Sequence, residues 1–189
     1  RPYTPLFVKG YRVHTISAFM EHFTGMEKLP ETSKEWLSIP PSSIACLVNG
    51  EIFRDDLGAF TRMRQYFQAY YPDPLWYRLI AQCAGQMAQA GQYNYNRQMR
   101  RGEYVSARLA LNEFMRQTMQ MVYLLNRRYP PYEKWLHQGI KNMPILPQIY
   151  GICNALTDMP NQKEAWENLT DEEAEGINGN DQVSLTIEI

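Results

Sequence analysis

One short stretch of the sequence, GQYNYNRQMRRGEY at residues 91–104, combines aromatic and basic side chains between two glycines. Arginine guanidinium groups bind phosphate through paired hydrogen bonds, and tyrosine rings can stack on a nucleobase. The same composition also fits a solvated corner between two helices, with the tyrosines packed inward. The candidate residues for binding a substrate or nucleotide are Tyr93, Tyr95, Arg97, Arg100 and Arg101.

A second group of candidates is acidic. Glu51, Asp55 and Asp56 lie in the phrase NGEIFRDDLGAF, where carboxylates could hold Mg²⁺ or act as acid and base. An aspartate just before an apolar periodic run is also a common helix start, and Arg54 can form a surface salt bridge beside it. The sequence favours this capping interpretation over a metal site.

No other catalytic pattern is present. His14, His22 and His137 have no metal-ligand spacing with one another or with a cysteine. A Gly-rich phosphate loop, a nucleophile elbow and a histidine–glutamate zinc helix are all missing from the sequence. We therefore predict neither a metal site nor a complete catalytic site.

Composition limits the partners. The 189 residues carry a net charge of −1, which gives no global field to attract nucleic acid or an anionic membrane. No apolar run reaches the roughly 20 residues of a membrane helix, and the N-terminus lacks a signal-peptide pattern. The three cysteines are far apart in apolar surroundings, which is typical of reduced, buried thiols in the cytoplasm.

The elements that position these residues are helices. Apolar residues recur at three- and four-residue steps over residues 103–129, which predicts one long helix that ends at Pro130 and Pro131. Arg127 and Arg128 are placed to neutralise its carbonyl end. Two further long helices are predicted over residues 73–91 and 57–70, the first ending near Gly91 or continuing past a kink. Shorter helices are expected at residues 17–23, 33–37, 132–141, 145–156 and 162–168.

The predicted fold class is mainly α, an up-and-down bundle of three or four long helices plus short ones. A short β-strand is expected near the N-terminus, at residues 11–16. The expected domain organisation is a linker or residual strand at 1–16, the bundle at 17–169, and an acidic loop with a truncated segment at 170–189. Whether residues 183–189 form a strand or a helix stays open.

Two phrases of the sequence resemble a known family. They are NGEIFRDDLGAFTRMRQYFQAYYP at residues 49–72 and GQYNYNRQMRRGEYVSARLALNEFMRQTMQMVYLLNRRYPPYEKWLH at residues 91–137. From about Val13 to Trp166, the chain is similar to a bacterial domain of unknown function that forms the C-terminal helical part of nucleotidyltransferase-like proteins. This arrangement resembles antibiotic nucleotidyltransferases, whose helical C-terminal domains help to bind the acceptor and close the cleft.

The sequence departs from the family's catalytic pattern. Nucleotidyltransferases need a Gly-Ser turn for the triphosphate and an Asp-x-Asp pair that bridges two Mg²⁺ ions. Neither pattern occurs here, and the run at residues 11–16 carries His14 where a carboxylate would be needed. We therefore expect no catalytic residue and no cofactor in this chain. Mg²⁺ and a nucleoside triphosphate would belong to the parent protein.

The resemblance implies a substrate-binding or scaffold domain that is not catalytic alone and whose partner is an N-terminal nucleotidyltransferase-like domain. Arg97, Arg100 and Arg101 would then meet phosphate in the shared cleft, and Tyr93 or Tyr95 would stack. The alternative is a non-catalytic helical module for protein–protein interaction. Such a module could pair with another protein or form a homo-oligomer. A third hypothesis, a module that binds nucleic acid or cleaves RNA, ranks last because no arginine is followed four residues later by a histidine.

Overall fold

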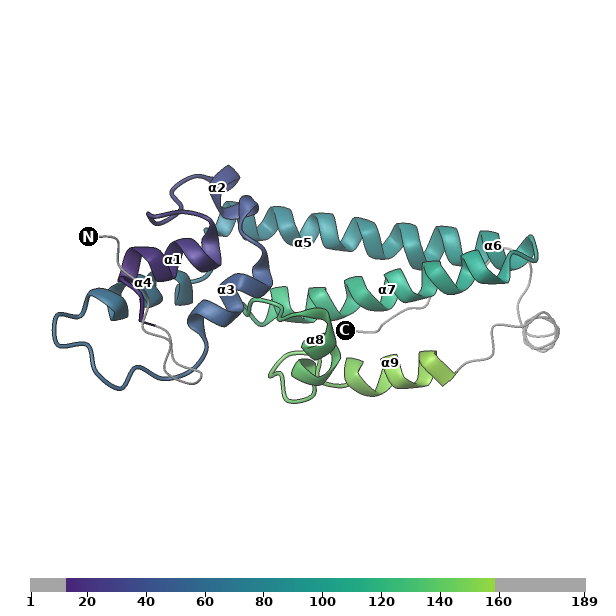
Figure 1. Cartoon of the computed structure of the whole chain (residues 1–189). Helices are drawn as coiled ribbons and strands as arrows, with labels where there is room; N and C mark the ends of the chain where they lie inside the picture. The colour runs from purple at the N-terminus through teal and green to yellow at the C-terminus, as the bar shows by residue number, and fades with distance from the viewer. Residues whose placement is uncertain (1–12, 159–189) are drawn as a thin grey trace. The chain divides into compact units, whose positions relative to one another are not determined.

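The structure is a computed structural model that describes residues 13–158 (Figure 1). In this part of the chain the fold is mainly helical, as predicted, and no strand is formed. None of the described helices is long and apolar enough to cross a membrane. The helical segments are α1 (Ile16–Thr24), α2 (Ser33–Ser38), α3 (Pro41–Val48), α4 (Ala59–Gln68), α5 (Asp73–Met87), the π-helix η1 (Ala88–Tyr95), α6 (Asn96–Arg100), α7 (Tyr104–Leu125), α8 (Glu133–Ile140) and α9 (Ile149–Asp158).

The predicted N-terminal strand is wrong where the structure describes it. Residues 13–15 form no strand, and Ile16 is the first residue of α1. Thr15 caps this helix, because its side-chain oxygen accepts a hydrogen bond from the Ala18 amide at 3.2 Å. A capping hydroxyl satisfies an amide that has no partner inside the helix, so the local cap prevails over the alternating apolar pattern. Tyr11 and Arg12 lie outside the described residues.

The chain separates into two compact units, and the following description covers their described residues only. Unit 1 comprises Arg1–Tyr77 and Arg127–Trp135, and unit 2 comprises Arg78–Asn126 and Leu136–Ile189. The division falls within α5 and within α8, so the chain passes from unit 1 to unit 2, returns to unit 1, and ends in unit 2. The predicted domain limit at residue 169 and the predicted helix at 162–168 lie outside the described range.

Unit 1 has an aromatic core. In this unit α1 packs against α3, and α3 packs against α4. The Trp36 ring stacks on Tyr66 with centroids 5.7 Å apart and meets Phe67 edge-on at 5.5 Å. Tyr129 comes from the returning segment, and its hydroxyl donates a hydrogen bond to the Phe67 carbonyl at 2.8 Å. A residue 62 positions away therefore completes the core around α4.

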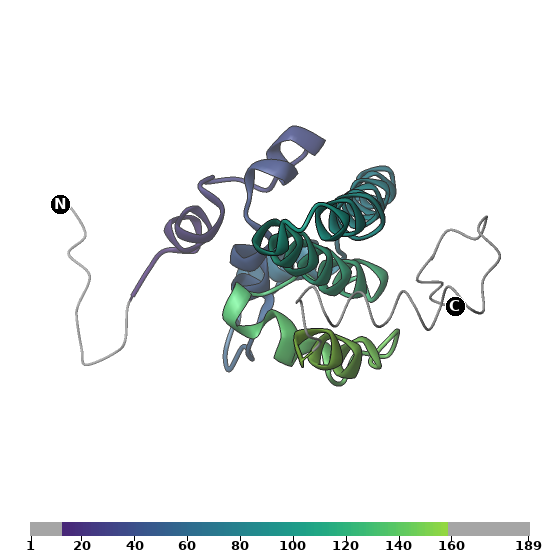
Figure 2. The ribbon, with the colours of Figure 1, turned by 90° about the vertical axis from the view of Figure 1, so that its right-hand side faces the viewer.

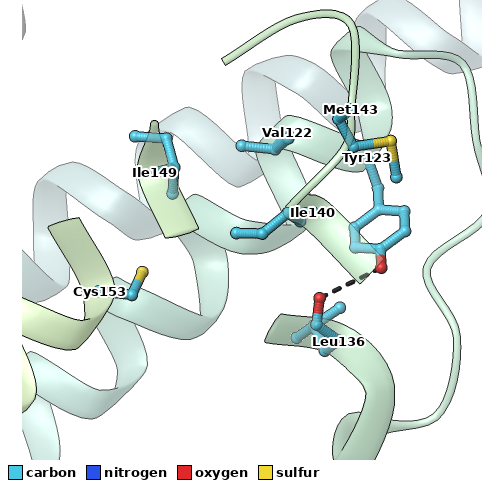
Figure 3. Packing of buried hydrophobic residues seen from close by; sticks show 7 residues of the cluster. All are labelled: Val122, Tyr123, Leu136, Ile140, Met143, Ile149 and Cys153. Carbon is cyan, nitrogen blue, oxygen red and sulfur yellow. Dashed lines mark hydrogen bonds between the residues drawn. The ribbon is translucent and has the colours of Figure 1, made fainter. Parts of the chain in front are cut away.

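Unit 2 is organised around α7. Figures 1 and 2 show α7 running beside η1 and α6, with α9 on another side. Seven buried residues form its apolar cluster (Figure 3), in which the Tyr123 hydroxyl donates to the Leu136 carbonyl at 3.1 Å. The cluster contains Val122, Tyr123, Leu136, Ile140, Met143, Ile149 and Cys153.

The described chain has fewer long helices than predicted. The long helix expected at residues 103–129 is α7, with 22 residues, and it ends at Leu125 where the Asn126 side chain binds the Val122 carbonyl. The long helix expected at 57–70 is shortened to the 10 residues of α4. Gly58 precedes it with φ +67° and Tyr70 follows it with φ +75°, left-handed conformations that an α-helix cannot include.

Candidate functional site

The stretch at residues 91–104 is a helix surface over most of its length. A helix end near Gly91 was predicted, but α5 runs directly into η1 and then into α6, as the alternative prediction of a continued helix had it. Gly91 packs so closely against α7 that an added Cβ would lie 2.6 Å from Cδ2 of Phe114. The glycine therefore serves close helix packing here, and no turn forms at this position.

Tyr93 and Arg97 form a pair on the exposed side of this helical run. The Arg97 guanidinium donates a hydrogen bond to the Tyr93 hydroxyl, and its Cζ atom lies 5.4 Å from the centre of the Tyr93 ring. Tyr93 is 53% exposed, and Arg97 is also exposed. The four-residue spacing places both side chains on one face of the helix. This is the part of the predicted site that the structure brings together.

Arg100 and Arg101 follow on the same side. They lie three and four residues after Arg97, a spacing that places side chains on a common helix face. Both are exposed, and neither forms an ion pair with a described carboxylate. Arg100 is the last residue of α6 and Arg101 is its C-cap, so their charges also complement the carbonyl end of that helix.

Tyr95 lies apart from the other four candidates. It is two residues from Tyr93, and side chains at this spacing do not share a helix face. Tyr95 is half-buried, and burial raises the pKa of its hydroxyl, while the positive charge of Arg108 on α7 acts in the opposite direction. The ring therefore belongs to the inner side of the helix, as the alternative of an inward-packed tyrosine had it.

Of the acidic candidates, Asp55 binds an amide in the first turn of α4, whose N-cap is Gly58, and Asp56 forms a surface ion pair. Asp55 Oδ2 accepts a hydrogen bond from the Thr61 amide at 2.7 Å, and this bond holds the pKa of the carboxyl below its ordinary value. Asp56 pairs with Arg54 at 2.7 Å on the surface, and Glu51 is exposed. Within residues 13–158, no group of three or more His, Cys, Asp or Glu side chains could hold a metal ion.

Sequence reasoning missed the role of Arg64. This arginine is 6% exposed, and its Nη2 donates to the carbonyls of Val48, Asn49 and Gly50 at 2.5, 3.2 and 2.8 Å. The guanidinium thus satisfies the carbonyl end of α3. A signal was available, because position 64 falls between Phe60 and Phe67 on the apolar stripe of the predicted helix.

The side chain of Arg127 has a different partner from the one predicted. It was predicted to neutralise the carbonyl end of the long helix, but its side chain turns to the start of α5. There its Nη2 pairs with Asp73 Oδ1 at 2.9 Å, and its Cζ lies 3.9 Å from the centre of the Trp76 ring. Arg127 has φ +49°, a backbone conformation rare outside glycine, in the turn that follows α7.

One histidine and two of the three cysteines lie in structural surroundings, and the third cysteine differs from its prediction. His137 Nε2 lies 3.0 Å from the Tyr150 carbonyl oxygen, and its ring stacks on Tyr150 at 4.2 Å. Cys83 and Cys153 are buried thiols, and burial raises the pKa of Cys83 to about 11. Cys46 is exposed, against the prediction of a buried thiol, because it lies on the outer face of α3 opposite the buried Ile44 and Leu47.

One family model matches the chain, and its region contains most of the two sequence phrases, residues 49–72 and 91–137, that carry the resemblance. Comparison with curated proteins and with solved structures finds no match. The matching family model is described as "Domain of unknown function (DUF4037)", and it covers residues 36–136, more than half of the chain. These residues include α4 to α7, and with them every candidate described above. The chain belongs to the DUF4037 family.

Proposed function

We propose that this chain is the helical substrate-binding or scaffold part of a nucleotidyltransferase-like protein and that it has no catalytic residue of its own. The observation that carries the proposal is the exposed Tyr93–Arg97 pair, continued by Arg100 and Arg101 on one helical run. An aromatic ring beside several guanidinium groups suits a ligand that has both a base and phosphates. The resemblance of the two sequence phrases supports the same assignment.

The ends of two helices influence what this surface would bind. The carbonyl end of α6 disfavours an anion, but the amide end of α7 begins only four residues later, and Glu103 at its N-cap forms no side-chain capping hydrogen bond. An anion near Arg101 would be favoured by the neighbouring guanidinium groups and by the amide end of α7, and opposed by the carboxylate of Glu103. We therefore propose phosphate contacts on Arg97, Arg100 and Arg101 and base contacts on Tyr93, which lies beside Arg97. Tyr95, which is half-buried, keeps at most a supporting role.

The donor set of the described residues does not fit Mg²⁺. Asp55 is held by the Thr61 amide and Asp56 by Arg54, and among the described residues Glu51 belongs to no group of three or more possible metal ligands. We therefore assign Mg²⁺ and the nucleoside triphosphate to the partner, an N-terminal nucleotidyltransferase-like domain of the parent protein. The up-and-down bundle remains part of the proposal, with α5–α6 and α7 as two of its long helices. A cytoplasmic location is also proposed, on the basis of the three separate thiols.

Calorimetric titration of the parent protein with Mg²⁺·ATP tests the proposal. Replacing Arg97 and Arg101 together by glutamine removes two charge-assisted hydrogen-bond donors, each contributing roughly 1.5–3 kcal/mol. We expect the Kd for Mg²⁺·ATP to rise about a hundredfold or more, since each 1.4 kcal/mol corresponds to about a factor of ten. The chain itself, without the partner domain, should bind Mg²⁺·ATP more weakly than the parent protein does.

The matched control is Arg78→Gln, which removes an exposed arginine from α5, outside the candidate surface. It should leave the Kd unchanged. If the Arg97 and Arg101 double variant binds Mg²⁺·ATP as well as the Arg78 variant, this surface does not meet the nucleotide. A parent protein without a Gly-Ser turn and an Asp-x-Asp pair would remove the transferase assignment altogether.

A further inference from the structure

The most exposed large apolar side chains of the described chain lie on one loop of unit 1. Residues 49–58, here called the Phe53 loop, join α3 to α4 and form a long open connection in Figure 1. Phe53 is 95% exposed and Leu57 is 83% exposed. Single exposed apolar residues are usual on a protein surface, whereas two on one loop are a candidate for contact with another molecule.

Contacts with α4 hold both ends of this loop. Arg64 binds the carbonyls of Asn49 and Gly50 at the beginning of the loop. At its end, Asp55 accepts the Thr61 amide at 2.7 Å, and Arg62 Nη1 donates to the Leu57 carbonyl at 3.1 Å. Because the loop is held before any partner arrives, presenting Phe53 costs little conformational entropy on binding.

The charge of the Phe53 loop narrows the choice of partner. The loop contains three acidic residues, Glu51, Asp55 and Asp56, and one basic residue, Arg54. Its net charge is therefore −2. An acidic surface is repelled by nucleic acid and by anionic lipid. Its complement is an apolar or aromatic surface with basic residues around it.

Such a surface exists on the same chain. Residues 127–135, here called the Trp135 segment, contain three basic residues against Glu133 alone. Trp135 is 56% exposed and Tyr132 is 53% exposed, three positions apart at the beginning of α8. Lys134 Nζ lies 5.8 Å from the centre of the Trp135 ring, so a cation accompanies the exposed indole. Arg128 is also exposed, whereas Arg127 is already paired with Asp73.

We propose that the Phe53 loop of one molecule binds the Trp135 segment of a second copy of this chain. Phe53 and Leu57 would pack on Trp135 and Tyr132, and Lys134 and Arg128 would face the carboxylates of the loop. In a twofold dimer each molecule gives one loop and receives one, so the contact forms twice. Aromatic anchors surrounded by complementary charge are the residues that dominate interface energies.

Sedimentation velocity over a series of protein concentrations tests this proposal. The wild-type chain should form dimers with a dissociation constant in the micromolar range, and added salt should weaken them because the charges are exposed. Phe53→Ser and Trp135→Ser should each raise the dissociation constant at least about tenfold. Val105→Ser is the matched control, because Val105 is 78% exposed on α7, outside both surfaces, and this variant should dimerise like the wild type.

Mixing the two variants gives the sharpest result. A dimer of the Phe53→Ser chain has no intact contact, and neither has a dimer of the Trp135→Ser chain. A mixed dimer keeps one, formed by the intact loop of the Trp135→Ser chain and the intact segment of the Phe53→Ser chain. With one variant fluorescently labelled, the mixture should associate more strongly than either variant alone.

Several outcomes would overturn the proposal. A wild-type chain that stays monomeric up to near-millimolar concentration has no such dimer. Dimers that lose affinity in Phe53→Ser but keep it in Trp135→Ser use the loop on a different surface. A mixture that associates no better than its components excludes the reciprocal contact. Phe53-dependent sedimentation of a monomeric chain with vesicles of anionic lipid would assign the loop to membranes instead.

Discussion

Asp55 shows how one hydrogen bond decides between two roles of a carboxylate. Its Oδ2 accepts the amide of Thr61 in the first turn of α4. The pKa of the carboxyl is therefore lower in the folded chain than in the unfolded chain. A lowered folded pKa contributes stability that is complete above the ordinary pKa of an unfolded aspartate and that is lost as the pH falls through the folded value.

Asp55→Asn tests this assignment, because asparagine keeps an oxygen that can accept the Thr61 amide but does not titrate. We expect the loss of stability between neutral and strongly acidic pH to be smaller in the variant than in the wild type. Urea midpoints measured at several pH values for both chains give the comparison. Equal acid dependence in the two chains would mean that the Asp55 carboxylate does not contribute.

Single residues of the candidate surface were predictable from the sequence to different degrees. Residue types and the spacing of Tyr93 and Arg97 place these two side chains on one face, as the structure has them. Tyr95 was grouped with them because the spacing of residues in a loop does not predict which way each side chain points. Once the stretch is helical, the two-residue spacing separates Tyr95 from Tyr93. A capping role for Asp55 or Asp56 was predicted from their place before an apolar run, and the Asp55 carboxylate does accept an amide in the first turn of α4, although the N-cap position itself is Gly58.

The junction of α5, η1 and α6 is the element that sequence patterns described least well. Periodicity identified α7 and α5, since both carry a long apolar stripe. Glycine at position 91 favoured a break, because glycine is common where helices end. A single sequence does not show that Phe114, 23 positions later, needs the space that a side chain at position 91 would fill. The helix therefore continues, and eight residues of it adopt the wider π form.

Gly91→Ala measures how much this close packing contributes. The new Cβ would lie 2.6 Å from Phe114 Cδ2, so the ring or the helix must move. We expect the free energy of unfolding to fall by about 1–3 kcal/mol, as for other overpacked positions. Chemical denaturation followed by circular dichroism gives the value.

Two companion variants show whether Phe114 is the cause. Gly85→Ala adds the same atom to α5 where nothing lies within 4 Å, so helix propensity should make it neutral or stabilising by up to about 1 kcal/mol. Phe114→Leu shortens the obstructing side chain, and the Gly91→Ala change should then cost less than it does beside phenylalanine. An unchanged cost in the Phe114→Leu background would place the strain elsewhere.

The path of the chain through its two units explains why a linear division into domains was difficult. Sequence patterns give elements in order, and the predicted limits followed changes in composition. Composition does not predict that residues 127–135 belong to unit 1. Their place in this unit depends on a tertiary contact, in which Tyr129 packs beside Tyr70 and Tyr71. Burial raises the pKa of all three hydroxyls, as expected for rings enclosed in an apolar core.

Tyr129→Ala tests whether unit 1 depends on this distant segment. The substitution removes a side chain that is 7% exposed and a hydrogen bond to the Phe67 carbonyl, and comparable aromatic truncations cost about 3–5 kcal/mol. Hydrogen exchange of the intact chain should then become faster in α4 of unit 1, while α9 of unit 2 keeps its protection. Tyr129→Phe retains the ring, so it should lose only the contribution of the hydrogen bond to the free energy of unfolding, about 1 kcal/mol. Equal loss of protection in α4 and α9 would instead show that both units unfold together, and no loss in α4 would show that unit 1 is complete without Tyr129.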